Sequence, residues 1–222
     1  MHHSAPGGRR RCWHAFCVPK ASAFDAAPMI LSFLQHRLPA WPLQDPVTAG
    51  RTSEITAGQQ AQILVLWGGE VRNERALFGR RDAPDGPLIT SERRDRTWPA
   101  AQAAVWETQR CLVPIAGFSV AGDAAHGAWI CDTSGALFAA GLRSSMQTRD
   151  GFHLSCFSLL TEVPATPELP NEVPLLIGAD DVIEWLYLDG AEALRRLQHV
   201  PAQRFVSVAT LLRGPLPHER PH

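Results

Sequence analysis

The sequence predicts an α+β fold: a single domain with one strongly bent, mainly antiparallel β-sheet and a few short helices. Short apolar runs of β type follow one another from Gln62 onward, separated by turns rich in glycine and proline. Helical spacing is confined to a few short stretches. No internal repeat marks a second domain, and 222 residues with 45% hydrophobic content suit one core.

The domain is expected to span residues 12–212. Residues 1–11 (MHHSAPGGRRR) predict a mobile basic extension, and residues 213–222 a C-terminal tail. Residues 13–18 are compatible with a short strand. Residues 26–38 predict a helix, because their apolar side chains recur at helical spacing.

The strongest β pattern lies between residues 62 and 79. QILVLWG (62–68) is an apolar run that stops at a pair of glycines, and ERALFG (74–79) resumes it, so the two runs predict a hairpin. PLITS (87–91) predicts a short strand, and the alanine-rich residues 99–108 predict a helix.

The central part of the chain predicts three more strands. They are expected in CLVPIAGF (111–118) and in the two apolar halves of AWICDTSGALFAAGL (128–142), where the DTSG cluster predicts the turn of a second hairpin. GFHLSCFSLL (151–160) alternates between apolar and polar residues and is expected to extend that sheet.

The C-terminal third predicts two strands and two short helices. PLLIG (174–178) predicts a short buried strand, and residues 204–212 predict the last one. Residues 180–188 predict a helix that one of its two leading aspartates caps, and residues 191–199 predict a second helix.

Charge and cysteine content narrow the class of protein. The formal net charge is −1, so the overall balance points neither to nucleic acid nor to an anionic membrane. Five cysteines lack the even, dense spacing of a disulfide scaffold, and no apolar run approaches the ~18 residues of a transmembrane helix. No secretory signal pattern is present. We therefore expect a cytoplasmic monomer that contacts no membrane.

Several phrases, in the same order, resemble the SOS response-associated peptidase (SRAP) family. CLVPIAGF resembles the family's C-L-I-P-A-x-G-F, and LFAAGL (137–142) resembles F-x-A-G-L-W. VPLLIGADDVIEWL (173–186) aligns without a gap with M-P-V-I-L-x-P-E-x-x-x-x-W-L. EITAGQ (54–59) resembles N-I-A-P-T-Q, and PLITSER resembles the x-I-N-A-R run. The resemblance covers roughly residues 12 to 212 and implies the SRAP fold; an unrelated β-rich domain is the alternative.

The resemblance also implies a function in the DNA-damage response. The family's N-terminal cysteine attacks the aldehyde of an abasic site in single-stranded DNA with its α-amine and its thiol, and a DNA–protein crosslink results. The cysteine, the amine and the aldehyde suffice, so the resemblance implies no cofactor. Its asparagine, glutamate and histidine position the sugar and move protons, and its arginines hold phosphates.

The family's catalytic residues do not transfer to this sequence. Its asparagine, glutamate and histidine align with Thr90, Val120 and Pro170, none of which can act as an acid or a base near neutral pH. Cys12 is the nearest candidate nucleophile, but eleven residues precede it, so its nitrogen is an amide. Proteolysis after Arg11 would be needed to expose it.

The charges at the expected DNA groove have changed as well. The family's asparagine of N-I-A-P aligns with Glu54, and two of its arginines align with Glu92 and Glu172. Such a groove attracts phosphates less strongly. Arg93 and Arg94 are the candidates that could compensate, and Arg94 alone shares a strand face with Glu92.

The other cysteine, histidine, serine and aromatic residues favour structural roles over catalytic or metal-binding ones. Cys12, His14 and Cys17 match no closed zinc motif, so we expect no metal. Ser119 with His153 lacks the ordered acid partner and the G-x-S-x-G motif of a hydrolase. The aromatic residues Trp67, Trp129 and Phe138 are expected in the core or in a groove, and the cysteines at 111, 131 and 156 are expected to be small buried hydrophobic residues.

Three hypotheses for function remain at this point. In the first, the chain is a catalytically degenerate SRAP protein, a pseudoenzyme that binds single-stranded DNA weakly or binds a protein partner. In the second, processing exposes Cys12 and the chain is an active abasic-site sensor. In the third, the scaffold serves an unrelated purpose or has no selected activity.

Overall fold

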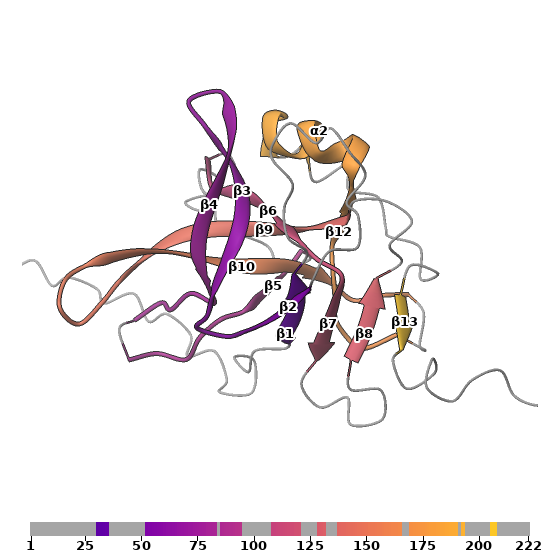
Figure 1. Cartoon of the computed structure of the whole chain (residues 1–222), viewed down its shortest axis with the longest axis horizontal. Coiled ribbons are helices and arrows are strands. Elements are labelled where there is room, and N and C mark those ends of the chain that lie inside the picture. Colours follow the sequence, from indigo (N-terminus) through magenta and orange to yellow (C-terminus); the bar gives the residue numbers. More distant parts are fainter. Residues whose placement is uncertain are drawn as a thin grey trace, which may run out of the picture.

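The structure, a computed structural model, describes residues 30–35, 52–83, 85–94, 108–120, 128–131, 137–165, 169–190, 192–193 and 205–207 (Figure 1). These residues are mostly β, with few and short helical segments. The expected strand at 13–18, the expected helix at 99–108, the basic extension and the C-terminal tail lie outside or almost wholly outside the described residues, as do Cys12, His14 and Cys17.

The first sheet is antiparallel throughout. Its strands follow the order β13-β8-β7-β1-β2. The strands are β13 (Phe205–Ser207), β8 (Ala128–Cys131), β7 (Gly117–Val120), β1 (Ile30–Gln35) and β2 (Ser53–Thr56). Figure 1 shows them side by side in one half of the molecule.

The second sheet closes on itself. Its five main strands are β3 (Gln60–Trp67), β4 (Glu70–Phe78), β10 (His153–Glu162), β9 (Leu137–Gln147) and β6 (Arg110–Pro114). Each of the five pairs with two others, in the ring β3-β4-β10-β9-β6-β3. Three short strands pair with this ring: β5 (Ser91–Arg93) and β11 (Val173–Pro174) with β10, and β12 (Leu176–Gly178) with β9.

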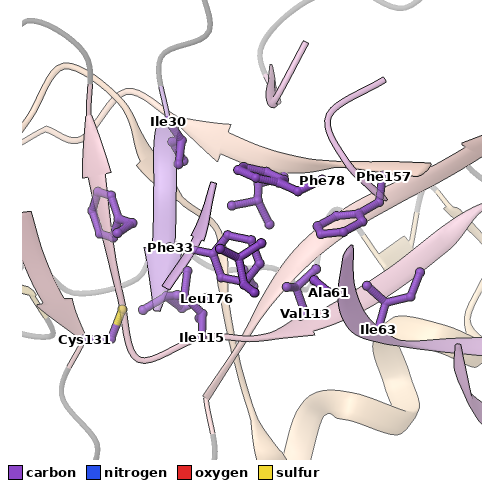
Figure 2. Close-up of a cluster of buried hydrophobic side chains, with 14 of the residues drawn as sticks. Ile30, Phe33, Ala61, Ile63, Phe78, Val113, Ile115, Cys131, Phe157 and Leu176 are labelled. Carbon is purple, nitrogen blue, oxygen red and sulfur yellow. The ribbon is translucent and has the colours of Figure 1, made fainter. Parts of the chain in front are cut away.

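The described core has two hydrophobic clusters, of which the first holds the two sheets together. The first cluster joins both sheets and contains Phe33 of β1, Phe78 of β4 and Phe157 of β10 (Figure 2). The rings of Phe33 and Phe78 meet edge to face, with centroids 5.0 Å apart, and those of Phe78 and Phe157 are 5.4 Å apart. Ring pairs of this kind fix the angle at which the first sheet packs against the ring of strands.

The second cluster lies under the short helix. A 3-10 turn, η3 (Ala179–Asp181), leads into α2 (Val182–Tyr187). The side chain of Trp185 is buried in this cluster, and its Nε1 donates a hydrogen bond of 3.1 Å to the carbonyl of Cys111. This contact ties the segment 173–186 to the CLVPIAGF strand, two phrases on which the family resemblance depends.

The predicted hairpin at 62–79 is confirmed. β3 and β4 pair in register from Gln60 with Leu77 to Trp67 with Glu70, around a turn formed by Gly68 and Gly69. Both glycines have positive φ, 60° and 83°, as the tight turns of hairpins require. The strand at 151–160 and the helix at 180–188 are also found, with shifted ends. The single strand predicted at 174–178 is instead two short strands, β11 and β12, which pair with β10 and with β9.

The helix predicted for residues 26–38 is wrong over its described part, which is strand β1. Ile30, Ser32 and Phe33 are all buried because the pairing of β1 with β7 shifts register between Ile30 and Ser32. An irregularity of this kind interrupts the alternation of a strand, and the resulting spacing of apolar residues resembles that of a helix.

The hairpin predicted for residues 128–142 is also wrong. β8 pairs with β7 and β13 in the first sheet, whereas β9 pairs with β6, β10 and β12 in the second, so the expected single sheet is two. Trp129 and Cys131 of β8 pack in the first cluster, and the ring of Phe118 on β7 contacts that of Phe205 on β13. Burial against the first sheet therefore decides the partner of β8.

Two smaller expectations need correction. The short strand expected at 87–91 begins only at Ser91, preceded by a single bridge between Arg80 and Ile89. Neither η3 nor α2 starts with a side-chain cap: Asp181 precedes α2 but makes no capping hydrogen bond, and η3 leads directly into α2. Of the strand expected at 204–212, residues 205–207 are described.

Candidate functional site

Two of the positions that the sequence resemblance aligns with catalytic residues, Thr90 and Val120, both lie beside Ile30 of β1 in the first sheet. Thr90 is fully buried, and its Oγ1 donates a hydrogen bond of 2.7 Å to the carbonyl of Ile30. Ile30 is in turn the cross-strand partner of Val120, whose side chain is packed in the first cluster. The Thr90 hydroxyl is therefore engaged with the backbone, and the position of the family's glutamate belongs to the hydrophobic core.

The third catalytic position lies in the loop before β11. Pro170 is buried, and the neighbouring Leu169 packs against the first cluster. Two residues further, Glu172 is only 3% exposed, and its Oε1 accepts a hydrogen bond from the hydroxyl of Thr161 on β10. A carboxylate thus lies buried where the family has an arginine.

Glu92 is also buried, within an internal ion pair. Its Oε1 accepts a hydrogen bond of 2.8 Å from Nε of Arg80 and another from the hydroxyl of Ser158. Burial lowers the pKa of Arg80, but the hydrogen bond and charge of Glu92, together with Asp82, outweigh burial and raise it above its ordinary value. The guanidinium of Arg80 is therefore committed to these carboxylates.

The two arginines expected to contact DNA lie at the end of β5. Arg93 pairs with Thr161 of β10 in parallel register. Nη1 of Arg94 lies 3.8 Å from a carboxylate oxygen of Glu162, which is largely buried. Part of the positive charge that the sequence offers for phosphates is thus balanced inside the protein.

A polar row crosses the first sheet beside Val120. The hydroxyl of Ser32 on β1 donates a 2.8 Å hydrogen bond to Oε1 of Glu54 on β2, and it lies 2.8 Å from the hydroxyl of Ser119 on β7. A hydroxyl has one proton, so Ser119 donates to Ser32. The exposed carboxylate of Glu54, which the sequence resemblance placed in the DNA groove, thus accepts a hydrogen bond from one neutral side chain, that of Ser32.

A second polar group lies on the face of β4, β9 and β10 that also carries residues of the first cluster. Nη1 of Arg143 lies 2.6 Å from Oε2 of Glu74, and the hydroxyl of Ser155 donates a 2.5 Å hydrogen bond to the other oxygen. The guanidinium also lies over the ring of Trp67, 5.6 Å from its centroid. Trp67 is 57% exposed, unlike Trp129 and Phe138, which are in the core as expected.

The remaining sequence candidates do not assemble into a catalytic group within the described residues. His153 is exposed, and its Nδ1 lies 3.1 Å from the hydroxyl of Ser145, not near Ser119. Burial raises the pKa of all three described thiols, at Cys111, Cys131 and Cys156. No group of three or more potential metal ligands occurs in this part of the chain. None of its helices is long and apolar enough to cross a bilayer.

The buried states of Glu92, Glu162 and Glu172 escaped the sequence analysis. Glu92 lies between Ser91 and Arg93, and the other two each precede a valine; charged residues are usually exposed, so no local pattern indicated burial. The basic residues that pair with two of them come from separate segments: the bridge between Arg80 and Ile89 brings Arg80 near Glu92, and the pairing of β5 with β10 brings Arg94 near Glu162. For Glu172, the only hint of an unusual environment in the sequence was the acid at a position that the resemblance aligns with an arginine.

No family model matches the chain, and no curated protein does. Solved structures share the fold. A protein from Bordetella bronchiseptica is 12% identical, with a TM-score of 0.59 over 79% of this chain and 97% of that one. A phage-related protein from the same organism is 17% identical, with a TM-score of 0.59 over 79% and 92%. A protein from Bacteroides thetaiotaomicron is 17% identical, with a TM-score of 0.53 over 69% and 75%.

These likenesses show a shared fold. The chain is thus a mostly β protein of the fold adopted by these bacterial proteins, with buried carboxylates around the N-terminal end of β11 and the end of β10.

Proposed function

We propose that this chain is a divergent SRAP-type protein, related to the DNA-damage response, that binds a partner and carries out no chemistry at the family's catalytic positions. The observation that carries the proposal is the hydrogen bond from Thr90 to the carbonyl of Ile30 beside the buried Val120. A buried hydroxyl that is already donating, an alkyl side chain and a proline cannot transfer protons to or from a sugar. The positions that the resemblance aligns with catalytic residues therefore carry no group for acid–base chemistry.

A protein partner suits this site better than single-stranded DNA. Binding of a phosphate chain depends on free cationic side chains and on the release of counterions. Here Arg80 and Arg94 pair with Glu92 and Glu162. Single-stranded DNA is therefore expected to bind weakly and with a shallow dependence on salt.

A covalent assay tests the loss of chemistry. The full chain is incubated with single-stranded DNA that contains one abasic site, and the products are separated on a denaturing gel. We expect no protein–DNA band. A shifted band that disappears in Cys12→Ala would overturn the proposal in favour of the abasic-site crosslinker, and mass spectrometry of the N-terminus would show whether residues 1–11 had been removed.

A titration tests the weakness of DNA binding. The affinity for an unmodified single strand is measured at several salt concentrations in the wild type and in Arg93→Ala/Arg94→Ala. Each phosphate contact adds about 0.7 to the slope of log affinity against log salt. We expect a slope near that of a single contact and little change in the double variant; a slope of about 3 that falls in the double variant would contradict the proposal.

A further inference from the structure

Glu172 differs from the other buried carboxylates in its lack of a cation. Glu92 has Arg80 and Glu162 has Arg94 within ion-pair distance. Glu172 is more deeply buried than either, at 3% exposure, and its partner is the neutral hydroxyl of Thr161. Within the described residues, no arginine or histidine lies within ion-pair distance of it.

A carboxylate in this state is unfavourable without a counter-charge. Removing an ionised carboxylate from water is costly unless it is paired and fully hydrogen-bonded. One hydroxyl satisfies one of its roughly four lone-pair sites. Oε2 receives no hydrogen bond from the described residues, so the carboxylate retains acceptor capacity for an incoming donor.

The surroundings of Glu172 fit the side chain of an arginine. The antiparallel register of β10 with β11 pairs Thr161 with Pro174 and Glu162 with Val173, and one further step places Val163 opposite Glu172. Val163 is 49% exposed and lies on the same strand face as Thr161. The preceding residue, Asn171, is exposed, so the chain reaches the surface one residue before Glu172.

We propose that Glu172 is the anchor of a binding site for a cationic side chain, above all the guanidinium of an arginine on a protein partner. This proposal rests on the proposed function and gives the partner its chemistry. The planar guanidinium donates to Oε2 while Thr161 holds Oε1, and the aliphatic stem packs on Val163. The low dielectric around a buried carboxylate strengthens the attraction relative to an exposed ion pair.

The test is a titration of the full chain with the peptide acetyl-Gly-Arg-Gly-amide, followed by backbone amide chemical shifts in NMR. The matched probe carries citrulline, which has nearly the same shape and no charge. We expect saturable shifts centred on Thr161, Val163 and Glu172, and an affinity for the citrulline peptide that is at least about tenfold lower. Equal affinities for the two peptides, or no saturation with the arginine peptide, would overturn the proposal.

Two variants and one control locate the site. Glu172→Gln keeps the shape and an acceptor for Thr161, and it should weaken binding at least about tenfold. Thr161→Val keeps the shape but removes the hydroxyl, and it should strengthen binding, because the free carboxylate then has no donor. Glu70→Gln, in an exposed pair with Arg72, should leave the affinity unchanged. Unchanged binding in Glu172→Gln, with a folded amide spectrum, would refute the assignment.

The same titration distinguishes a protein partner from nucleic acid. An oligothymidylate that shifts the same amides at lower concentration than the arginine peptide would refute the proposal in favour of nucleic acid. The covalent assay with abasic DNA is independent of these titrations. Failure of the arginine site therefore leaves the proposed loss of chemistry standing, and a crosslinked band refutes that loss whatever the peptide does.

Discussion

The hydroxyl of Thr90 donates a 2.7 Å hydrogen bond to the backbone carbonyl of Ile30, and both residues are fully buried. The bond joins the segment before β5, which pairs with the strand ring, to β1 in the first sheet. Ile30 is also the cross-strand partner of Val120, so the two positions that the sequence resemblance aligns with catalytic residues share one neighbour. The hydroxyl of Thr90 thus serves the packing of the two sheets.

Thr90→Val should destabilise the protein. The substitution preserves shape but removes the donor, so the carbonyl of Ile30 loses a partner in a site without water access. The free energy of unfolding should fall by about 1–3 kcal/mol, measured by urea denaturation. Thr90→Ser keeps the donor and should cost less. Equal losses in the two variants would mean that the methyl group, not the hydrogen bond, stabilises this junction.

Val120→Glu should destabilise the protein in a pH-dependent way. Val120 is 5% exposed, and a carboxylate introduced there is desolvated, with its pKa in the folded state above the unfolded value of about 4.3. The free energy of unfolding should fall by at least about 2 kcal/mol at pH 7 and by less near pH 3, where the group is almost wholly neutral in both states. A loss that is independent of pH would show that the new carboxylate reaches water.

Arg80→Met should destabilise the protein because the hydroxyl of Ser158 is then the remaining partner of the buried Glu92. The free energy of unfolding should fall by about 2–3 kcal/mol, which is less than for a fully buried pair because Arg80 is partly exposed. Arg80→Met/Glu92→Met should recover much of it. Arg72→Met, in an exposed pair with Glu70, should change the free energy of unfolding by under about 0.5 kcal/mol. If the loss in the double variant equals the sum of the losses in Arg80→Met and Glu92→Met, then Arg80 and Glu92 are not coupled.

The sequence predicted local structure better than partners between strands. The hairpin at β3 and β4 was predictable because two glycines with positive φ stand between two apolar runs. The partner of β8 was not, since Trp129 and Cys131 would suit the inner face of either sheet. Likewise β1 resembled a helix because a local shift of register places Ile30, Ser32 and Phe33 all inside.

At the candidate site, too, residue types were informative from the sequence, whereas contacts between distant segments were not. Residue types alone indicate that Val120 and Pro170 cannot act as acid or base. The burial of Glu172 beside Thr161 depends on the pairing of β11 with β10, which no local pattern encodes. Charges brought together by distant segments, such as Arg94 with Glu162, are therefore features that only the tertiary structure reveals.

The three described thiols should resist alkylation in the native protein. Burial raises the pKa of Cys131 to about 12, so only about one molecule in ten thousand carries the thiolate at pH 8. Burial also raises the pKa of Cys111 and Cys156, although the hydrogen bond with Ser144 and the charge of Arg80 oppose the shift at Cys156. Mass spectrometry after iodoacetamide treatment should find Cys156 modified fastest of the three.

The rate of this reaction should also keep rising with pH. A thiol with an ordinary pKa approaches its limiting rate above about pH 9, whereas a thiol with a raised pKa gains about tenfold per pH unit beyond that point. In urea, where burial is lost, the three rates should converge. Rapid modification of Cys131 at pH 8 without urea would mean that the interface of β7, β8 and β13 opens readily.

Gly141→Ala should be among the most damaging single-methyl additions to this protein. A β-carbon at residue 141 would lie 2.9 Å from Sγ of Cys111 and 2.9 Å from the carbonyl oxygen of Ser158. The first contact is with a side chain, but the second is with the backbone of β10, the neighbouring strand in the ring. Because neither strand can move without disturbing its own pairing, the free energy of unfolding should fall by about 1–3 kcal/mol.

Two variants separate the causes of that loss. In Gly178→Ala the nearest atom to the new β-carbon, Oδ2 of Asp181, is 3.6 Å away, an ordinary contact, so the free energy of unfolding should hardly change. In Gly141→Ala/Cys111→Ala the sulfur is gone and the backbone contact remains. We expect this double variant to stay well below Cys111→Ala in stability, as measured by urea denaturation. If the double variant is as stable as Cys111→Ala, then the contact with the sulfur, and not that with the backbone of β10, excludes a β-carbon at residue 141.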